Sequence, residues 1–306
     1  MNDFDQAARF AAKLRPPQFL RWLMPKLDPR LVFRDWLDTR RLPYPGERDR
    51  TCDTVADFED TTAPGRHWAV VVEFESEPDP LGLARLFNYL GQLYLELESD
   101  PEKRGKYAVG GALLNLTGAE ESDTLEMRLP GMEEYGEWLR VVLRTLRTVD
   151  GAATLAGIAA GEIDRCLLPW IALMHGAADP GIIKEWRRLA DMEEDSRLRR
   201  QFGGLAQVFA ELARCAPEWK QGLEGWNVGE SQVVNEWRAE GDARGSLRTR
   251  RADVLRALEI RMKAPPPPEV VKTVESIDSL DELSRWLDAA IAATSLDEFL
   301  ATIRRS

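Results

Sequence analysis

The chain has few of the side chains on which many enzyme active sites depend. Its 306 residues include only three cysteines and two histidines, and all are far apart: Cys52, Cys166, Cys215, His67 and His175. Without a Cys-x-x-Cys pair, neither a zinc ribbon nor a disulfide framework is predicted. A Ser-His-Asp triad, a Cys-His pair and a histidine-rich metal site are equally unsupported. Any chemistry must therefore depend on carboxylates.

Long apolar runs are also missing. No segment approaches the roughly 18–20 apolar residues that cross a bilayer, and the mixed, acidic residues 1–12 do not resemble a signal peptide. The cysteines are then best explained as small buried side chains in a reducing compartment. We therefore expect a cytoplasmic protein without a membrane partner. The sequence has no glycine-rich loop of the P-loop or dinucleotide type, so nucleotide-driven chemistry is unsupported.

Basic residues are in the minority, at 41 against 52 acidic residues, and the resulting net charge of −11 does not favour binding to phosphates. The charges are unevenly distributed. Residues 1–50 hold 11 Lys and Arg against 7 Asp and Glu, whereas residues 51–136 hold 6 against 18. Most of these acids are expected at the surface, but any that cluster in a site would need a cation to neutralise them.

Hydrophobic patterns in the first half predict a compact α/β core. The expected order is a helical segment, a meander of three strands, a helix and a further strand. The predicted helices are 5–14, 17–23 and 83–97, and the predicted strands are 31–39, 50–58, 67–76, 106–116 and, more weakly, 124–129. Residues 137–147 fit a strand or a helix, and we favour the strand.

From residue 151 onward the sequence predicts helices. We divide the chain into an α/β domain (1–150), a helical extension (151–240) and an all-α C-terminal tail (241–306). Residues 226–241 contain glycine and few apolar side chains, so a mobile connection is expected there.

The C-terminal tail contains two signals for local structure. The prolines at 265–268 predict a stiff polyproline II spacer. After it, residues 279–282 and 295–298 both read Ser-Leu-Asp-Glu, which matches a capping box at the start of a helix. Two short antiparallel helices are expected.

Three carboxylates are predicted to meet where two strands pair. Because side chains alternate along a strand, Glu73 and Glu75 lie on one face of the strand at 67–76. Asp53 lies on the preceding strand, and pairing of the two strands would place it opposite the glutamates. Such an oxygen-rich site suits Mg²⁺ or Mn²⁺. The alternative is a solvated sheet face, which is the more common meaning of acids that alternate along a strand.

The order of motifs around these acids gives the pattern more specificity. The chain reads RTCDTVADFED, then WAVVVEFESEPDP, then LARLFNYLGQLYLEL. Over about residues 1–175 it resembles the recombination-promoting nuclease (Rpn), transposase-associated branch of the PD-(D/E)XK nuclease superfamily. The resemblance implies a restriction-endonuclease-like core and a metal-dependent DNA endonuclease connected with mobile DNA, recombination or defence.

The resemblance also implies a ligand set. Asp53 and Glu73 would bind Mg²⁺ or Mn²⁺ with the carbonyl of Phe74, and Glu75 would complete the catalytic group. Glu75 departs from the family, because the superfamily has lysine at this position and the Rpn branch usually has glutamine. It could bind a second ion, or it could mark a site that has lost its activity.

Further roles follow from the same resemblance. Arg85 and Tyr89 lie four residues apart on one helix face and would contact a phosphate or brace the acids. Asp5 matches an acid on the first helix of the family. Lys103 or Lys106, near the start of the next strand, could replace the missing lysine.

The segment 244–263 is a candidate DNA contact, because it holds seven basic residues against two acidic ones. Arg248, Arg250 and Arg251 would be the contacting side chains. The alternative is a solvated helix face, with Val254, Leu255 and Leu258, and in addition Met262, turned inward. A second hypothesis for the whole chain is a catalytically inactive nuclease-fold protein that acts as an interaction module or homo-oligomer through its helical C-terminal half.

Overall fold

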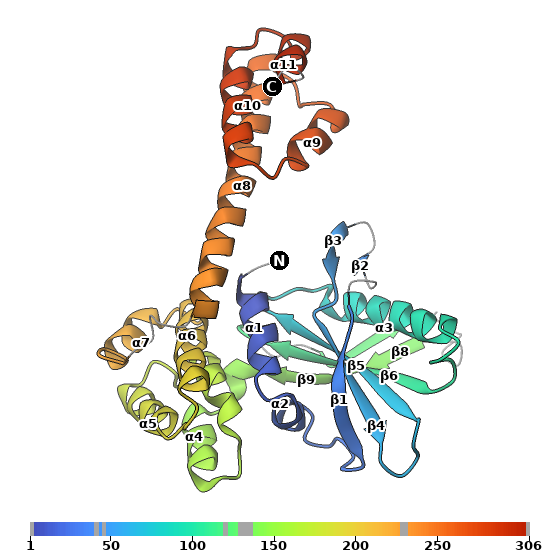
Figure 1. Cartoon of the computed structure of the whole chain (residues 1–306), viewed down its shortest axis with the longest axis vertical. Helices are drawn as coiled ribbons and strands as arrows, with labels where there is room; N and C mark the ends of the chain where they lie inside the picture. The colour runs from blue at the N-terminus through green and yellow to red at the C-terminus, as the bar shows by residue number, and fades with distance from the viewer. Residues whose placement is uncertain are drawn as a thin grey trace. The chain divides into compact units, whose positions relative to one another are not determined.

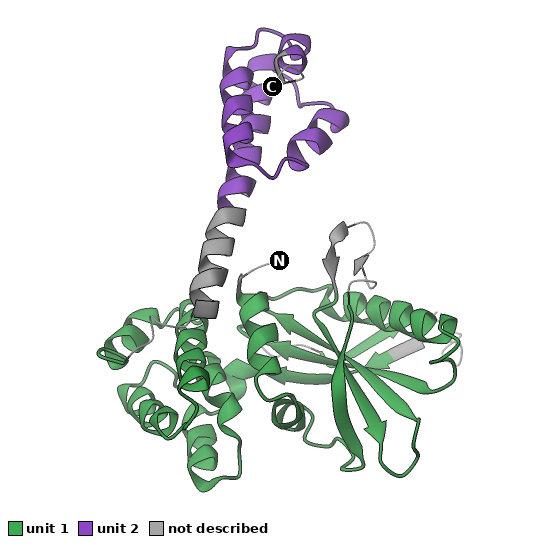
Figure 2. Ribbon diagram, viewed as in Figure 1, with its two compact units in different colours: residues 1–234 green, residues 235–306 purple. Residues whose placement is uncertain are grey.

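The computed structural model of the chain describes residues 3–39, 43–44, 47–118, 122–127, 137–226 and 232–303. They belong to two compact units, residues 1–234 and residues 235–306 (Figure 2). The first unit is mixed α/β, and the described part of the second is helical. The boundary expected between residues 150 and 151 therefore falls inside the first unit.

A five-stranded mixed sheet lies at the centre of the first unit (Figure 1). Its strands, in spatial order, are β1 (Leu31–Leu37), β4 (Thr54–Asp60), β5 (His67–Glu75), β6 (Tyr107–Asn115) and β9 (Val142–Thr145). The first three pair antiparallel, as expected for the meander, whereas β6 and β9 continue the sheet in parallel. A parallel neighbour needs a crossover connection, and α3 (Gly82–Ser99) provides it between β5 and β6.

Two small hairpins were only partly predicted. One consists of β2 (Pro43–Tyr44) and β3 (Glu47–Thr51), and the other of β7 (Thr124–Met127) and β8 (Glu137–Arg140). The single strand expected at 50–58 is wrong, because the chain leaves β3 at Thr51 and enters β4 at Thr54. The strand favoured at 137–147 is confirmed as far as Thr145, in two pieces.

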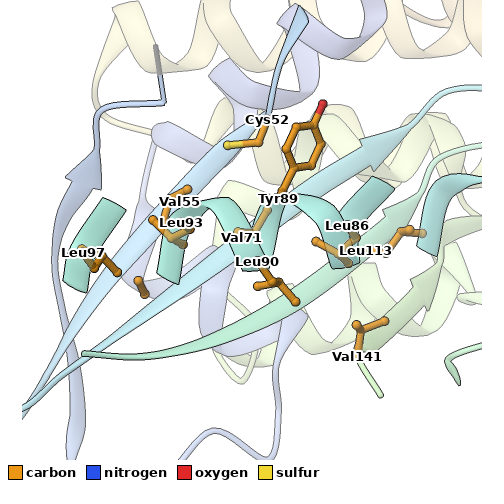
Figure 3. Close-up of a cluster of buried hydrophobic side chains, with 11 residues drawn as sticks. Cys52, Val55, Val71, Leu86, Tyr89, Leu90, Leu93, Leu97, Leu113 and Val141 are labelled. Carbon is orange, nitrogen blue, oxygen red and sulfur yellow. The ribbon is translucent and has the colours of Figure 1, made fainter. Parts of the chain in front are cut away.

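Helix α3 covers one face of the sheet (Figure 1). Its leucines recur at three- and four-residue steps and form the apolar stripe of an amphipathic helix. Leu86, Leu90 and Leu93 are buried against sheet residues such as Val55 and Val71 (Figure 3). The predicted alternation in β5 is confirmed here, since Ala69 and Val71 pack with the α3 leucines and Glu75 pairs with Arg85 of α3.

The opposite face is covered by helices from both ends of the first unit. Helix α1 (Asp3–Lys13) contacts β5, α2 (Pro16–Leu23) contacts β1, and the 3-10 segment η3 (Arg165–Leu173) reaches β5 through Trp170. The later helices pack on η3, on α1 or on one another: α4 (Gly151–Ala160), α5 (Pro180–Asp191), α6 (Ser196–Leu212) and α7 (Ala216–Gly222). The Trp170 ring stacks on Phe19 and Phe209, with ring centroids 5.2 and 5.1 Å apart, and on Phe74 of β5 at 6.1 Å. The helices after residue 151 thus share a core with the sheet.

The second unit contains α8 (Gln232–Met262) from residue 235 onward, together with α9 (Pro268–Glu275), α10 (Leu280–Ala292) and α11 (Leu296–Ile303). The serine half of both predicted capping boxes is confirmed: Ser279 Oγ accepts from the Glu282 N–H at 3.3 Å, and Ser295 Oγ accepts from the Glu298 N–H at 3.2 Å. The Glu298 side chain reaches back one residue further than predicted and accepts from the Thr294 N–H at 2.8 Å. Most of the first part of the connection expected at 226–241 (residues 227–231) lies outside the described residues, and from residue 232 onward the chain is in α8 instead.

Across the described ranges, every helix is too short or too polar to cross a lipid bilayer.

Candidate functional site

The three predicted acids come together at one end of the central sheet. Asp53 lies in the bend just before β4, and Glu73 and Glu75 lie at the C-terminal end of β5. In the β4–β5 register Thr54 pairs with Val72, which brings Asp53 beside Glu73. All three side chains are buried, with 7 or 8% of their surface exposed. The predicted proximity of Asp53 to the glutamate strand is therefore confirmed.

Two reciprocal hydrogen bonds join these acids to the backbone. The Asp53 N–H donates to Glu73 Oε1 at 2.8 Å, and the Phe74 N–H donates to Asp53 Oδ2 at 2.8 Å. Where the regular β4–β5 pairing ends, each carboxylate therefore accepts a hydrogen bond from a backbone N–H, in place of the backbone carbonyl that would accept it within a regular sheet. This exchange explains why Asp53 lies outside the strand in which the sequence placed it.

The backbone of Phe74 is directed toward the same acids. The Phe74 N–H points to Asp53, whereas the Glu75 carbonyl accepts from Leu116 N–H on the opposite side at 2.8 Å. Within a strand, the N–H and C=O of one residue point to the same neighbour. The Phe74 carbonyl is thus on the Asp53 side, while its ring packs on the other face of the sheet against Phe19 and Trp170.

Helix α1 contributes two charged residues. Arg9 Nε donates to Asp53 Oδ1 at 2.9 Å, and the same guanidinium forms an ion pair with that carboxylate. Asp5, one turn earlier, is close enough for its charge to raise the pKa of Asp53. Asp5 Oδ1 is buried and finds no hydrogen-bond donor among the described residues. No role was predicted for Arg9, although its four-residue spacing from Asp5 places both residues on one helix face.

Helix α3 contributes the second guanidinium. Arg85 donates to Glu75 Oε1 at 2.5 Å and forms a second ion pair with Asp79, in the Pro-Asp turn that precedes the helix. Asp79 belongs to the segment WAVVVEFESEPDP that carries the family resemblance, and no role was predicted for it. Tyr89, one turn beyond Arg85, is 3% exposed, and burial together with the negative charge of Glu73 raises its pKa.

Burial dominates the electrostatics of the site. It raises the pKa of Asp53 against the opposing effect of Arg9, and it raises the pKa of Glu73 further because the Asp53 charge adds to it. Burial also raises the pKa of the Glu75 carboxyl to about 7, although Arg85 opposes the change. Five carboxylates, including Asp5 and Asp79, share two guanidinium groups. The excess negative charge must be neutralised by protons or by a cation.

Replacing Glu75 with Gln is expected to stabilise the metal-free protein at neutral pH. The folded-state pKa of about 7 exceeds the unfolded value of about 4.3, so the folded state holds this proton more tightly. The contribution of Glu75 to the free energy of unfolding therefore falls as pH rises between these two pKa values. Allowing for solvent screening, Glu75→Gln should raise the free energy of unfolding by about 2 kcal/mol at roughly pH 8.

Urea denaturation of wild type and Glu75→Gln at several pH values checks this expectation. The gain should shrink steadily toward about pH 5 and be small there. A gain that does not change with pH would show that the effect comes from packing and not from the charge on Glu75.

The carboxylate oxygens are suitable ligands for a divalent cation, but those of Asp53 and Glu75 already form ion pairs. Within the described ranges, no three His, Cys, Asp or Glu side chains are already arranged around a common point for an ion. Arg9 and Arg85 lie against Asp53 and Glu75 instead. The unsatisfied Asp5 oxygen is the feature that a bound cation would complete, because a buried carboxylate oxygen without a partner is costly.

Lys103 and Lys106 do not replace the missing lysine. They precede β6, whose first residue Tyr107 pairs with His67 at the beginning of β5. The acids are at the other end of β5, six to eight residues away, or roughly 20–26 Å at 3.3 Å per residue. Lys103 forms an exposed pair with Asp100 at 3.5 Å. The prediction failed because the start of a parallel strand lies far from the end of its neighbour.

The basic segment of α8 has a structural role in the second unit. Arg251 donates to the Ile277 carbonyl at 2.8 and 3.0 Å and to Asp278 at 2.6 Å. The inward orientation predicted for Val254 and Leu258 is confirmed, since both are fully buried. Arg250 is half-buried, and the side chain of Arg248 lies outside the described residues.

Comparison with known proteins gives no match to a family model, to a curated protein or to a solved structure.

Proposed function

We propose that the chain is a divalent-metal-dependent DNA endonuclease with the fold and site of the PD-(D/E)XK superfamily, in its Rpn-type branch. The observation that carries the proposal is the buried excess of carboxylates around Asp53 and Glu73, supplied by the bend before β4, by β5 and by α1. Burying several like charges costs free energy of folding. Carboxylates with strongly raised pKa values that lie together are typical of functional sites.

Asp53, Glu73 and the Phe74 carbonyl would hold Mg²⁺ or Mn²⁺, with Asp5 or Glu75 nearby. When bound, such an ion polarises a phosphodiester and lowers the pKa of a bound water. Arg85 lies beside the acids, where its charge can orient a phosphate. The buried walls formed by Tyr89 and the α3 leucines would exclude bulk water from this side.

Calorimetric titration with Mg²⁺ and with Mn²⁺, followed by plasmid nicking with each ion, tests the proposal. We expect saturable binding of at least one ion and nicking that depends on it and stops when a chelator is added. Absence of binding at millimolar ion concentrations, together with intact plasmid, would overturn it. Both measurements use the full chain.

A specific observation favours a second candidate. Arg9 and Arg85 already form ion pairs with Asp53, Glu75 and Asp79, so the cluster could serve as a closed structural network in a catalytically inactive interaction module. In that case the wild-type protein would show neither ion binding nor nicking.

A further inference from the structure

The outer face of α3 has an unusual composition. The exposed positions of Gly82–Ser99, all of which the structure describes, are uncharged: Ala84, Phe87, Asn88, Gly91, Tyr94, Leu95 and Ser99. Glu98 lies on the same side near the end of the helix, but it is partly buried and its side chain accepts from the Gly105 N–H at 3.0 Å. In a chain with 30% charged residues, a solvent-facing helix would ordinarily carry charges on this side. Phe87, Tyr94 and Leu95 are 37, 48 and 66% exposed. This face, which we call the α3 outer face, is suited to burial against a partner.

Gly91 lies at the middle of this face, and no residue in the described part of the chain gives it a packing reason. A Cβ added there would meet nothing within 4 Å, whereas one added at Gly111 would contact Leu86 at 3.1 Å. Glycine in a helix interior costs stability relative to alanine. An exposed mid-helix glycine is useful where the backbone of another molecule approaches closely.

The α3 outer face is also self-complementary about Gly91. Phe87 and Leu95 lie four residues before and after it, and Asn88 and Tyr94 lie three residues before and after it. Two copies of α3 related by a two-fold axis at Gly91 would cross antiparallel and place Phe87 against Leu95 of the other copy. A two-fold interface requires a surface that matches itself in this way. With a net charge of −11 per chain, a face whose exposed positions carry no charge also limits repulsion between copies, and the partly buried Glu98 lies seven residues from the axis.

We propose that the α3 outer face binds a second copy of this chain in an antiparallel, two-fold helix pair centred on Gly91. An 18-residue helix is about 27 Å long, so its contact alone falls below the roughly 800 Å² per partner of a standard interface. The dimer is therefore expected to be weak and to dissociate on dilution. The surface differs from the helical C-terminal half in which the sequence analysis placed a homo-oligomer, and it does not depend on nuclease activity.

Disulfide crosslinking tests the geometry directly, because the three natural cysteines are buried. Under mild oxidation, Gly91→Cys should form a covalent dimer, since residues at a two-fold axis approach within the reach of a disulfide. Ser99→Cys is the matched control on the same exposed face. Eight residues from the axis, its two copies would be about 24 Å apart at 1.5 Å per residue and should remain uncrosslinked. Equal crosslinking of both variants would overturn the antiparallel arrangement.

Sedimentation velocity over a range of concentrations tests the surface. As the protein concentration rises, the wild type should shift from monomer to dimer, whereas Leu95→Glu should remain monomeric. Ile260→Glu, an equally exposed apolar residue of α8 at 64%, is the control and should dimerise like wild type. The proposal is wrong if the wild type stays monomeric up to about 1 mM, or if Ile260→Glu dissociates the dimer and Leu95→Glu does not.

Discussion

Glu73→Gln is expected to lower metal-dependent nicking by at least about a hundredfold. Glu73 is buried between Asp53 and Glu75, and glutamine keeps its size and an oxygen that can still accept from the Asp53 N–H. The substitution therefore removes a charge with little change in shape. Stabilisation of a bound ion and of charge in the transition state is worth several kcal/mol, and each 1.36 kcal/mol corresponds to a tenfold change in rate.

Glu59→Gln is the matched control for this substitution. Glu59 lies on β4 toward the opposite end of the sheet and pairs with Arg34 at 2.5 Å, so the same charge is removed far from the acids. We expect its nicking rate and ion binding to equal those of wild type. If folded Glu73→Gln retained wild-type ion affinity and nicking, Glu73 would not be a ligand and the site would have to be sought elsewhere.

Local periodicity was sufficient to predict the elements that carry the acids. Alternation in 67–76 and the three- and four-residue leucine spacing in 83–97 correctly indicated β5 and α3, because each element buries a single face. The residues from Arg50 to Phe58 also follow a strand pattern, yet the regular strand conformation is interrupted at Asp53. The break depends on hydrogen bonds between Asp53 and the end of β5, which are tertiary contacts that local sequence does not contain.

The composition of the site was predictable only in part. Glu73 and Glu75 follow from alternation in one strand, and the approach of Asp53 follows from pairing of neighbouring strands. Arg9 is 44 residues from Asp53 in the sequence, and nothing in the spacing of either segment indicates that α1 lies over the end of β5. Arg85, which the family resemblance had named as a residue that could brace the acids, does pair with Glu75, whereas Arg9 was found only in the structure.

Trp170→Ala is expected to lower the free energy of unfolding of the first unit by about 3–5 kcal/mol, the usual cost of removing a large core aromatic side chain. Trp170 is fully buried, and its ring stacks on Phe19, Phe74 and Phe209. Its Nε1 has no hydrogen-bond acceptor among the described residues, so the loss would come from packing alone. Urea denaturation followed by circular dichroism measures the change.

Trp226→Ala provides the comparison, because this half-buried ring packs edge-on against Trp186 and donates to Asp191 at 2.6 Å. Its loss should cost about 1–2 kcal/mol, because less apolar surface returns to water. Trp170 comes after residue 150 yet covers the β5 side chain next to Glu73, so its large effect would show that the sheet and the later helices unfold as one cooperative unit. The alternative outcome is two separate unfolding transitions, with Trp170→Ala moving only the transition of the helices after residue 150. That result would show that the α/β sheet is stable without those helices.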